Sequence, residues 1–185
     1  MLSSIRFSAL LLCLIFCMSS CKKEDPLPAA TQNGANTFGC KINGKAWIPD
    51  GGGGFSGIKP VTGGYQGTYI SDPAKCNVYV RSRKSDKTVV HLFIREVCVK
   101  GVYDLNSNTG TWDVQQRPLS YGLYIDSDGN YYITDVNHTG KVIVTHADTT
   151  NGVVSGRFEF TAINYVLNKV VTVTDGRFDI DFAKQ

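Results

Sequence analysis

Apolar and polar residues alternate with a period of two along most of the chain beyond residue 36. Residues 75–81, for example, place Cys76, Val78 and Val80 on one face of an extended strand. No stretch of this region sustains the 3.6-residue period of an amphipathic helix. The pattern therefore predicts β-strands throughout the region.

Turn-forming residues separate these segments. The expected strands lie at residues 37–42, 45–48, 65–70, 75–81, 88–97, 121–125, 130–134, 141–146, 153–163 and 169–182. Residues 88–97 are apolar on both faces, which is typical of a central strand that is covered on both sides. We expect an all-β fold, a single antiparallel β-sandwich or barrel of about ten strands that follows an N-terminal signal peptide.

Two local signals predict how neighbouring strands connect. Asn43-Gly44 lies between two short strand patterns, and both residues tolerate the positive φ of a two-residue hairpin turn. Residues 155–160 (SGRFEF) and 175–180 (DGRFDI) resemble each other. We expect these two segments to pair as a hairpin whose connection is residues 164–168.

The N-terminus has the features of a secretion signal. An apolar run at residues 7–18 follows Arg6 and is shorter than the roughly 20 residues that span a bilayer. The run closes on Ser19-Ser20-Cys21, which resembles the lipobox of bacterial lipoproteins. We expect residues 1–20 to be removed and acyl chains such as palmitate to be attached to Cys21. The alternative is an ordinary secretory signal with an incidental cysteine.

The residues after Cys21 give an indication of where in the cell the protein is located. Lys23, Glu24 and Asp25 resemble the Cys-x-Lys-acid-acid signal that carries Bacteroidota lipoproteins to the outer face of the outer membrane. A charged, solvated tether is the alternative interpretation. We expect a lipid-anchored protein of the outer membrane, exposed at the cell surface if the signal operates. Residues 26–36 have no apolar period, so residues 21–36 are expected to form a flexible tether before a β domain at residues 37–185.

Several segments together resemble a family of small Bacteroidota lipoproteins that carry a β-rich domain of unknown function. They are residues 40–47 (CKINGKAW), 101–105 (GVYDL), 140–148, 154–162 and 173–180. The resemblance covers most of residues 38–182. It implies the β fold and the envelope location, and it implies no activity and no site residues.

Charge and cysteine content narrow the possible partners. The chain has 19 basic and 16 acidic residues, and one basic residue, Arg6, leaves with the signal. This near balance predicts no nucleic-acid partner. Outside the cytoplasm disulfides persist, and Cys76 and Cys98 have matching strand parity. Their pairing would close a loop of about 20 residues, and Cys40 would be left unpaired.

No group of residues predicts a metal or cofactor site. Asp126 and Asp128 alternate as in a calcium loop but lack the closing Glu, so a hairpin turn is favoured. His91, His138 and His146 lie on separate segments without ligand spacing. Trp112 and Tyr121 are the aromatic residues most expected at the surface, where they could stack on a sugar.

The function that best fits these features is a membrane-anchored binding or structural module at the outer membrane. Its expected partners are the membrane, through the lipid on Cys21, and a glycan or an envelope protein. The alternatives are a glycan-active enzyme and a lipocalin-like carrier of a small hydrophobic ligand. The sequence favours a non-catalytic role and assigns no ligand-binding residues.

Overall fold

The computed structural model describes residues 26–52, 57–67, 76–108 and 119–184. Within them the chain forms eleven strands and one short 3₁₀ helix, η1 (Phe182–Lys184). The strands are β1 (Thr37–Ile42), β2 (Lys45–Trp47), β3 (Val61–Gly67), β4 (Cys76–Arg83), β5 (Val89–Ile94), β6 (Gly101–Leu105), β7 (Tyr121–Ile125), β8 (Tyr131–Ile133), β9 (Gly140–Asp148), β10 (Val153–Asn164) and β11 (Lys169–Asp181). The expected all-β fold is confirmed. The strand expected at residues 65–70 begins earlier, at Val61.

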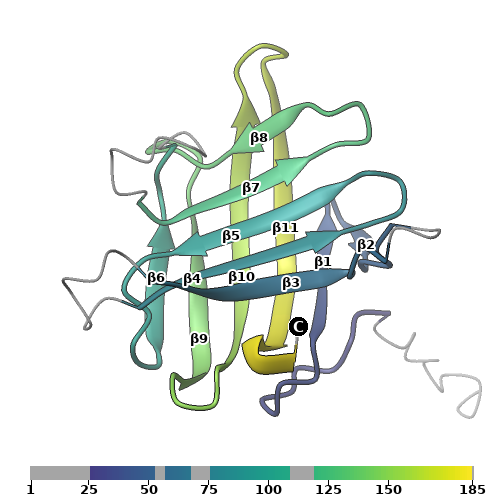
Figure 1. The fold of residues 1–185 in the computed structure, drawn as a ribbon. Helices are drawn as coiled ribbons and strands as arrows, with labels where there is room; N and C mark the ends of the chain where they lie inside the picture. The colour runs from purple at the N-terminus through teal and green to yellow at the C-terminus, as the bar shows by residue number, and fades with distance from the viewer. Residues whose placement is uncertain (1–25, 53–56, 68–75, 109–118, 185) are drawn as a thin grey trace, which may run out of the picture.

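The strands form two layers that are joined through β10 (Figure 1). The back layer has the order β2-β1-β11-β10-β9-β6, and the front layer, which crosses it in Figure 1, has the order β8-β7-β5-β4-β3. Ile163 near the end of β10 pairs with Ile133 of β8, so the sheet passes from one layer into the other there. All the pairings are antiparallel, and the sheet is not closed. The architecture is therefore sandwich-like and not a barrel.

Buried apolar side chains fill the space between the layers. The ring of Phe38 lies 5.1 Å from that of Phe158 and 6.0 Å from that of Trp47. Phe158 also lies 6.3 Å from Phe178. The front layer contributes Val78, Val80, Val90, Leu92 and Ile94, which are all fully buried. Cys40 lies in the same core as a free thiol.

The outer face of the front layer is also apolar around β5. Phe93, Tyr121 and Leu123 form a second buried cluster there. β5 pairs with β4 on one side and with β7 on the other. The prediction of a central strand that is covered on both faces is thus confirmed.

The repeated Gly-Arg-Phe segment forms the predicted hairpin between β10 and β11. Gly156 lies opposite Phe178, and Gly176 lies opposite Phe158. A Cβ atom on Gly156 would lie 2.8 Å from the ring of Phe178, and one on Gly176 would lie 2.6 Å from the ring of Phe158. Each glycine therefore makes room for the phenylalanine that faces it. Another consequence is that Arg157 lies directly opposite Arg177.

The predicted turn at Asn43-Gly44 joins β1 to β2, with φ values of 48° and 79°. Asn43 also connects β1 to β11. Its Oδ1 atom accepts a 2.9 Å hydrogen bond from the backbone N–H of Thr172, and its own N–H donates to the Thr172 carbonyl over 2.8 Å. This turn thus fixes the position of the β1–β2 hairpin on the sheet.

Residues 26–36 are docked on the outer face of the back layer, in contrast to the flexible tether expected there. Leu27 is 5% exposed. It lies with Pro28 over Gly39 of β1, where a Cβ atom would be 2.6 Å from Pro28 Cδ. The Arg177 guanidinium donates a 3.1 Å hydrogen bond to the Pro28 carbonyl. The apolar contact and the hydrogen bond make the segment part of the folded domain.

Candidate functional site

Two adjoining hollows lie on the outer face of the back layer, over β9, β10 and β11. Their volumes are about 330 and 430 Å³. Lys141 and Glu159 line both hollows. The first also contains Arg157, Asp175 and Arg177, and the second is lined mainly by threonines and backbone. Both are open to solvent, and the charged side chains around the first suit contact with a surface or with a charged group.

Lysines neutralise the carboxylates in these hollows. Lys141 Nζ lies 3.1 Å from Glu159 Oε1, and Lys41 Nζ lies 2.7 Å from Asp175 Oδ2. All four side chains are a third or more exposed, so neither pair has the desolvated setting of a buried ion pair. These pairs leave the charge of Arg157 without compensation from either carboxylate.

Arg157 and Arg177 face each other across β10 and β11. Like charges that lie directly opposite each other on one face of a sheet repel. Within residues 26–52, 57–67, 76–108 and 119–184, the Arg157 side chain has no ion pair or hydrogen bond, and it is exposed. Arg157 is therefore the cation on this face that is most available to an external anion.

A buried carboxylate, Asp179, holds the N-terminal segment against the same layer. It accepts hydrogen bonds from the hydroxyls of Thr31 and Ser155, both at 2.7 Å, and from three backbone N–H groups at residues 33–35, at 2.9 to 3.1 Å. Burial raises the pKa of Asp179, but these hydrogen bonds outweigh it and leave the pKa below its ordinary value. The carboxylate is thus a structural anchor with no free acceptor position for chemistry.

A second carboxylate, Asp135, fastens the β8–β9 connection to the β10–β11 hairpin. Its Oδ1 atom accepts from the backbone N–H groups of Asn137 and His138, at 2.7 and 2.5 Å, and lies 3.0 Å from His138 Nδ1. Its Oδ2 atom accepts from the Tyr165 hydroxyl. Burial raises the pKa of Asp135, yet the hydrogen bonds lower it to about 2 overall. The Asp135–His138 contact therefore stabilises the β8–β9 connection.

An exposed apolar patch lies at the end of that hairpin, which projects at the top of Figure 1. Val166 is 94% exposed and Val136 is 80% exposed. The hydrogen bond from Tyr165 to Asp135 brings the loop that carries Val136 to the hairpin. We call these residues the hairpin-tip patch, which consists of Val136, Tyr165, Val166, Leu167 and Val170.

The three histidines do not converge. His91 lies on β5 against Tyr121, with ring centroids 5.6 Å apart, and its buried Nε2 atom has no hydrogen-bond partner in the described part of the chain. Burial, helped by the charge of Arg81, lowers the pKa of His91 to about 4. His146 lies on β9, paired with Ser155. In the described residues no three His, Cys, Asp or Glu side chains are grouped as metal ligands would be.

Asp126 occupies a turn, as expected. Its Oδ1 atom accepts from the backbone N–H groups of Asp128 and Asn130, at 3.0 and 2.9 Å. Its Oδ2 atom accepts from the Asn130 side chain at 2.9 Å. These are the contacts of a hairpin turn between β7 and β8.

Several predicted site residues fall outside the described part of the chain. They are Cys21, Lys23, Glu24 and Asp25, and also Trp112. The expectation that Tyr121 is exposed is wrong, because it is 3% exposed and stacks on Phe93.

The cysteine pairing stays a prediction. Cys76 begins β4, and Cys98 follows β5 and is half-buried. The hairpin register places Val78 opposite Ile94, so both cysteines lie at the same end of one strand pair. The side chain of Cys76 lies outside the described part of the structure, so the Cys76–Cys98 disulfide is not tested by it.

Sequence reasoning missed the facing arginines, although the signal was present. The repeated Gly-Arg-Phe predicts that Arg157 and Arg177 share one face once the two segments pair. The carboxylate contacts of Asp179 carried no such signal. That residue alternates with apolar neighbours, a pattern typical of a solvated strand face, whereas residues 31–35 cover it.

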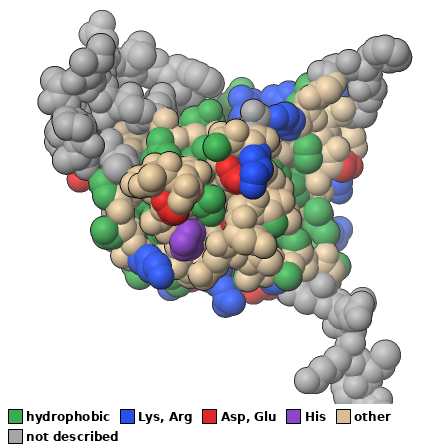
Figure 2. Space-filling model, turned by 60° about the horizontal axis from the view of Figure 1, so that its bottom comes forward, with side chains coloured by type: hydrophobic (Ala, Val, Ile, Leu, Met, Phe, Trp, Pro, Cys, Tyr) green, Lys and Arg blue, Asp and Glu red, His purple; other side chains and the backbone are tan. Residues whose placement is uncertain are grey.

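Charged and apolar side chains are mixed on one face of the molecule. Figure 2, which turns the bottom of the molecule forward, shows acidic, basic and apolar side chains interspersed over that face. Among the described residues, no helix has the length and apolarity required to cross a membrane.

Comparison with known proteins gives one match. A domain of unknown function (DUF6252) is found at residues 95–179. All residues that line the two hollows fall within this range, as does the hairpin-tip patch. No curated protein and no solved structure matches the chain.

Proposed function

We propose that this chain is a lipoprotein of the bacterial outer membrane, anchored through acyl chains on Cys21, whose β domain binds an envelope protein. The observation that carries the binding role is the hairpin-tip patch. Its most exposed member, Val166, is 94% exposed on a projecting hairpin. Contiguous apolar side chains at the surface of a folded domain are typical of protein interaction sites.

The occupant follows from the composition of the patch. Aliphatic side chains predominate, with Tyr165 as the aromatic member, and its hydroxyl is already bonded to Asp135. A sugar ring stacks on an open aromatic face, whereas aliphatic branches pack into the apolar surface of another protein. A protein partner therefore fits the patch better than a glycan does.

The filled interior of the domain does not favour the alternative of a carrier for a small hydrophobic ligand. A carrier needs a cavity between its layers, and in this domain the rings of Phe38, Phe158 and Phe178 pack against one another there.

The glycan-active alternative needs a carboxylic acid held in a desolvated pocket. Glu159 and Asp175 share the first hollow, but they are exposed and ion-paired to Lys141 and Lys41. The surface-binding role is the one that both the filled core and the exposed patch support.

Anchoring is tested by labelling cells with palmitate. We expect the label on the wild type and none on Cys21→Ala, which should also leave the membrane fraction. Label that persists on Cys21→Ala would overturn the anchoring half of the proposal.

Binding is tested by placing a photoreactive residue at Val136 in intact cells, with Val99, which is exposed on another part of the chain, as the control position. We expect a discrete adduct from position 136 that Val166→Asp abolishes and that position 99 does not give. An adduct of twice the chain mass, or none that depends on Val166, would overturn the envelope-protein partner.

A further inference from the structure

A row of side chains runs across four strands on the outer face of the back layer. Reading across the strands, Val102 of β6 pairs with Ile143 of β9, Ile143 with Arg157 of β10, and Arg157 with Arg177 of β11. Val102 is 64% exposed and Ile143 is 38% exposed. Exposed apolar residues thus continue directly into two facing arginines.

The neighbouring row does not cancel the positive charge of Arg157. Glu159 and Asp175 are already paired with Lys141 and Lys41, at 3.1 and 2.7 Å. The hollow of about 330 Å³ beside Arg157 is therefore bordered by three cations and by two carboxylates that have lysine partners. A face with surplus cations beside apolar side chains matches the chemistry of a lipid headgroup region.

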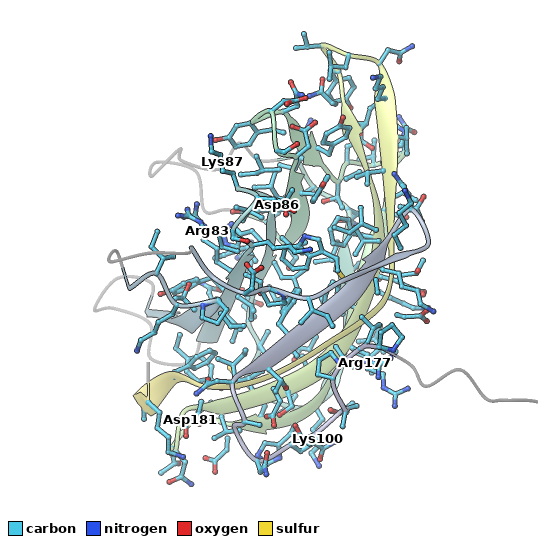
Figure 3. All side chains as sticks on the ribbon, turned by 90° about the vertical axis from the view of Figure 1, so that its right-hand side faces the viewer. Arg83, Asp86, Lys87, Lys100, Arg177 and Asp181 are labelled. Atoms are coloured by element: carbon cyan, nitrogen blue, oxygen red, sulfur yellow. The ribbon has the colours of Figure 1, made fainter. Side chains whose placement is uncertain are left out.

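The N-terminal segment ends on this same face. The Pro28 carbonyl accepts the hydrogen bond from Arg177, and Leu27 is buried over β1. Figure 3 shows Arg177 on the outer side of the back layer, on the side of the molecule opposite Arg83, Asp86 and Lys87. The described chain therefore begins beside Arg157 and Arg177, which we call the arginine row.

The distance to the anchor is short. Cys21 precedes Pro26 by five residues, which extend over at most about 17 Å. A lipid on Cys21 would hold Pro26 within about that distance of the bilayer surface, and Arg177 contacts the chain two residues further on, at Pro28. Attraction to anionic headgroups acts over a Debye length of about 10 Å, so a small rotation of the domain brings the row into range.

We propose that this face, with Arg157 at its centre, lies against the phosphate headgroups of the membrane that holds the lipid anchor. The inference rests on the proposed lipidation of Cys21, because the short chain between the lipid and Pro26 selects the face. The docked segment and the arginine row then fix the orientation of the domain. The front layer with Lys87 faces away from the membrane.

The test uses the lipidated protein in vesicles of phosphatidylcholine, with and without phosphatidylglycerol. A fluorescent residue at Val102 reports contact through quenching by a nitroxide at headgroup depth. We expect quenching that the anionic lipid increases several-fold and that Arg157→Glu reduces several-fold. Arg157→Lys should retain it. Lys87→Glu, which changes the same charge on the opposite side, should leave it unchanged.

Each outcome has one meaning. Palmitate-labelled protein that shows no quenching at Val102, or equal effects of Arg157→Glu and Lys87→Glu, would overturn the inference and leave the lipidation standing. Protein without palmitate label that does not enter vesicles would overturn both proposals. Loss of the quenching on addition of inorganic phosphate alone would show a site for the free anion and would overturn the membrane contact.

Discussion

Ser155 and Asp179 lie on neighbouring strands and share a 2.7 Å hydrogen bond between the serine hydroxyl and the carboxylate. The same carboxylate receives the Thr31 hydroxyl and three backbone N–H groups from the segment before β1. One side chain thus joins the sheet to residues that lie 144 to 148 positions earlier in the sequence. The docking of residues 26–36 depends on it.

Asp179→Asn should destabilise the domain by about 3 kcal/mol, because hydrogen bonds to a charged acceptor are lost and buried donors are left unsatisfied. Urea unfolding measures the loss. Limited proteolysis should also begin to cut within residues 26–36. Asp128→Asn, at an exposed turn, is the control and should change neither quantity. Unchanged protease resistance of Asp179→Asn would contradict the anchoring role.

Acid should loosen the hairpin tip through Asp135. Burial raises its pKa, but the hydrogen bonds from the Tyr165 hydroxyl and from the N–H groups of residues 137 and 138 outweigh burial and lower the pKa to about 2 in the folded domain. A depressed carboxylate pKa adds stability above about pH 4, and this stability is lost as pH falls toward 2. Tyr165→Phe should therefore lower stability at pH 7 and reduce the loss between pH 4 and 2. Tyr131→Phe, at an exposed tyrosine, is the control, and an identical acid response of both variants would refute the assignment.

His91 should be a source of instability in mild acid. Burial and the charge of Arg81 lower its pKa to about 4, so between pH 6.5 and 4 the unfolded chain binds a proton that the folded domain does not. The stability that comes from neutral His91 is fully present above pH 6.5 and is lost as pH falls toward 4. His91→Leu also removes the unsatisfied Nε2 atom and should stabilise the domain by about 1 to 3 kcal/mol. The gain should grow as pH falls from 6.5 to 4 in calorimetric scans, and a gain of equal size at both pH values would contradict the lowered pKa of His91.

The predicted Cys76–Cys98 disulfide is checked by mass spectrometry of the mature protein without reductant. One free thiol, at Cys40, is expected, because Cys40 lies in the core as a free thiol and burial raises its pKa. Reduction should cost about 3 kcal/mol, the value for a closed loop of this length. Two or more free thiols at these positions would disprove the pairing.

The export signal is tested with Glu24→Ala and Asp25→Ala together. Lipidation at Cys21 should persist, while protease shaving of intact cells should no longer reach the protein. Lys22→Ala, at the variable position of the motif, is the control and should stay accessible. Equal accessibility of the double variant and the wild type would leave the acidic pair as a plain tether.

The sequence predicted the strands well, because alternation such as that of Val78 and Val80 is a local property that burial enforces. It also predicted the turn at Asn43-Gly44, where positive φ is required. It did not predict the layer order or the docked N-terminal segment. Leu27 and Asp179 meet their neighbours only after β1 has paired with β11, and no short pattern in residues 26–36 encodes that contact. The arginine row could be predicted only in part. The repeated Gly-Arg-Phe places the two arginines opposite each other only if the two segments are assumed to pair as a hairpin.

The pairing of β1 with β11 has a consequence for when the domain can form. Thr37 pairs with Asp179, so the strand that is synthesised first needs the strand that is synthesised last. The segment carrying Leu27 and Thr31 needs the same late strand. Closing so long a loop is slow, and β10 and β11 form first because they are adjacent in sequence. The back layer therefore cannot be completed before β11 has left the ribosome, so β1 and the segment before it wait without their partner strand until β11 has been made.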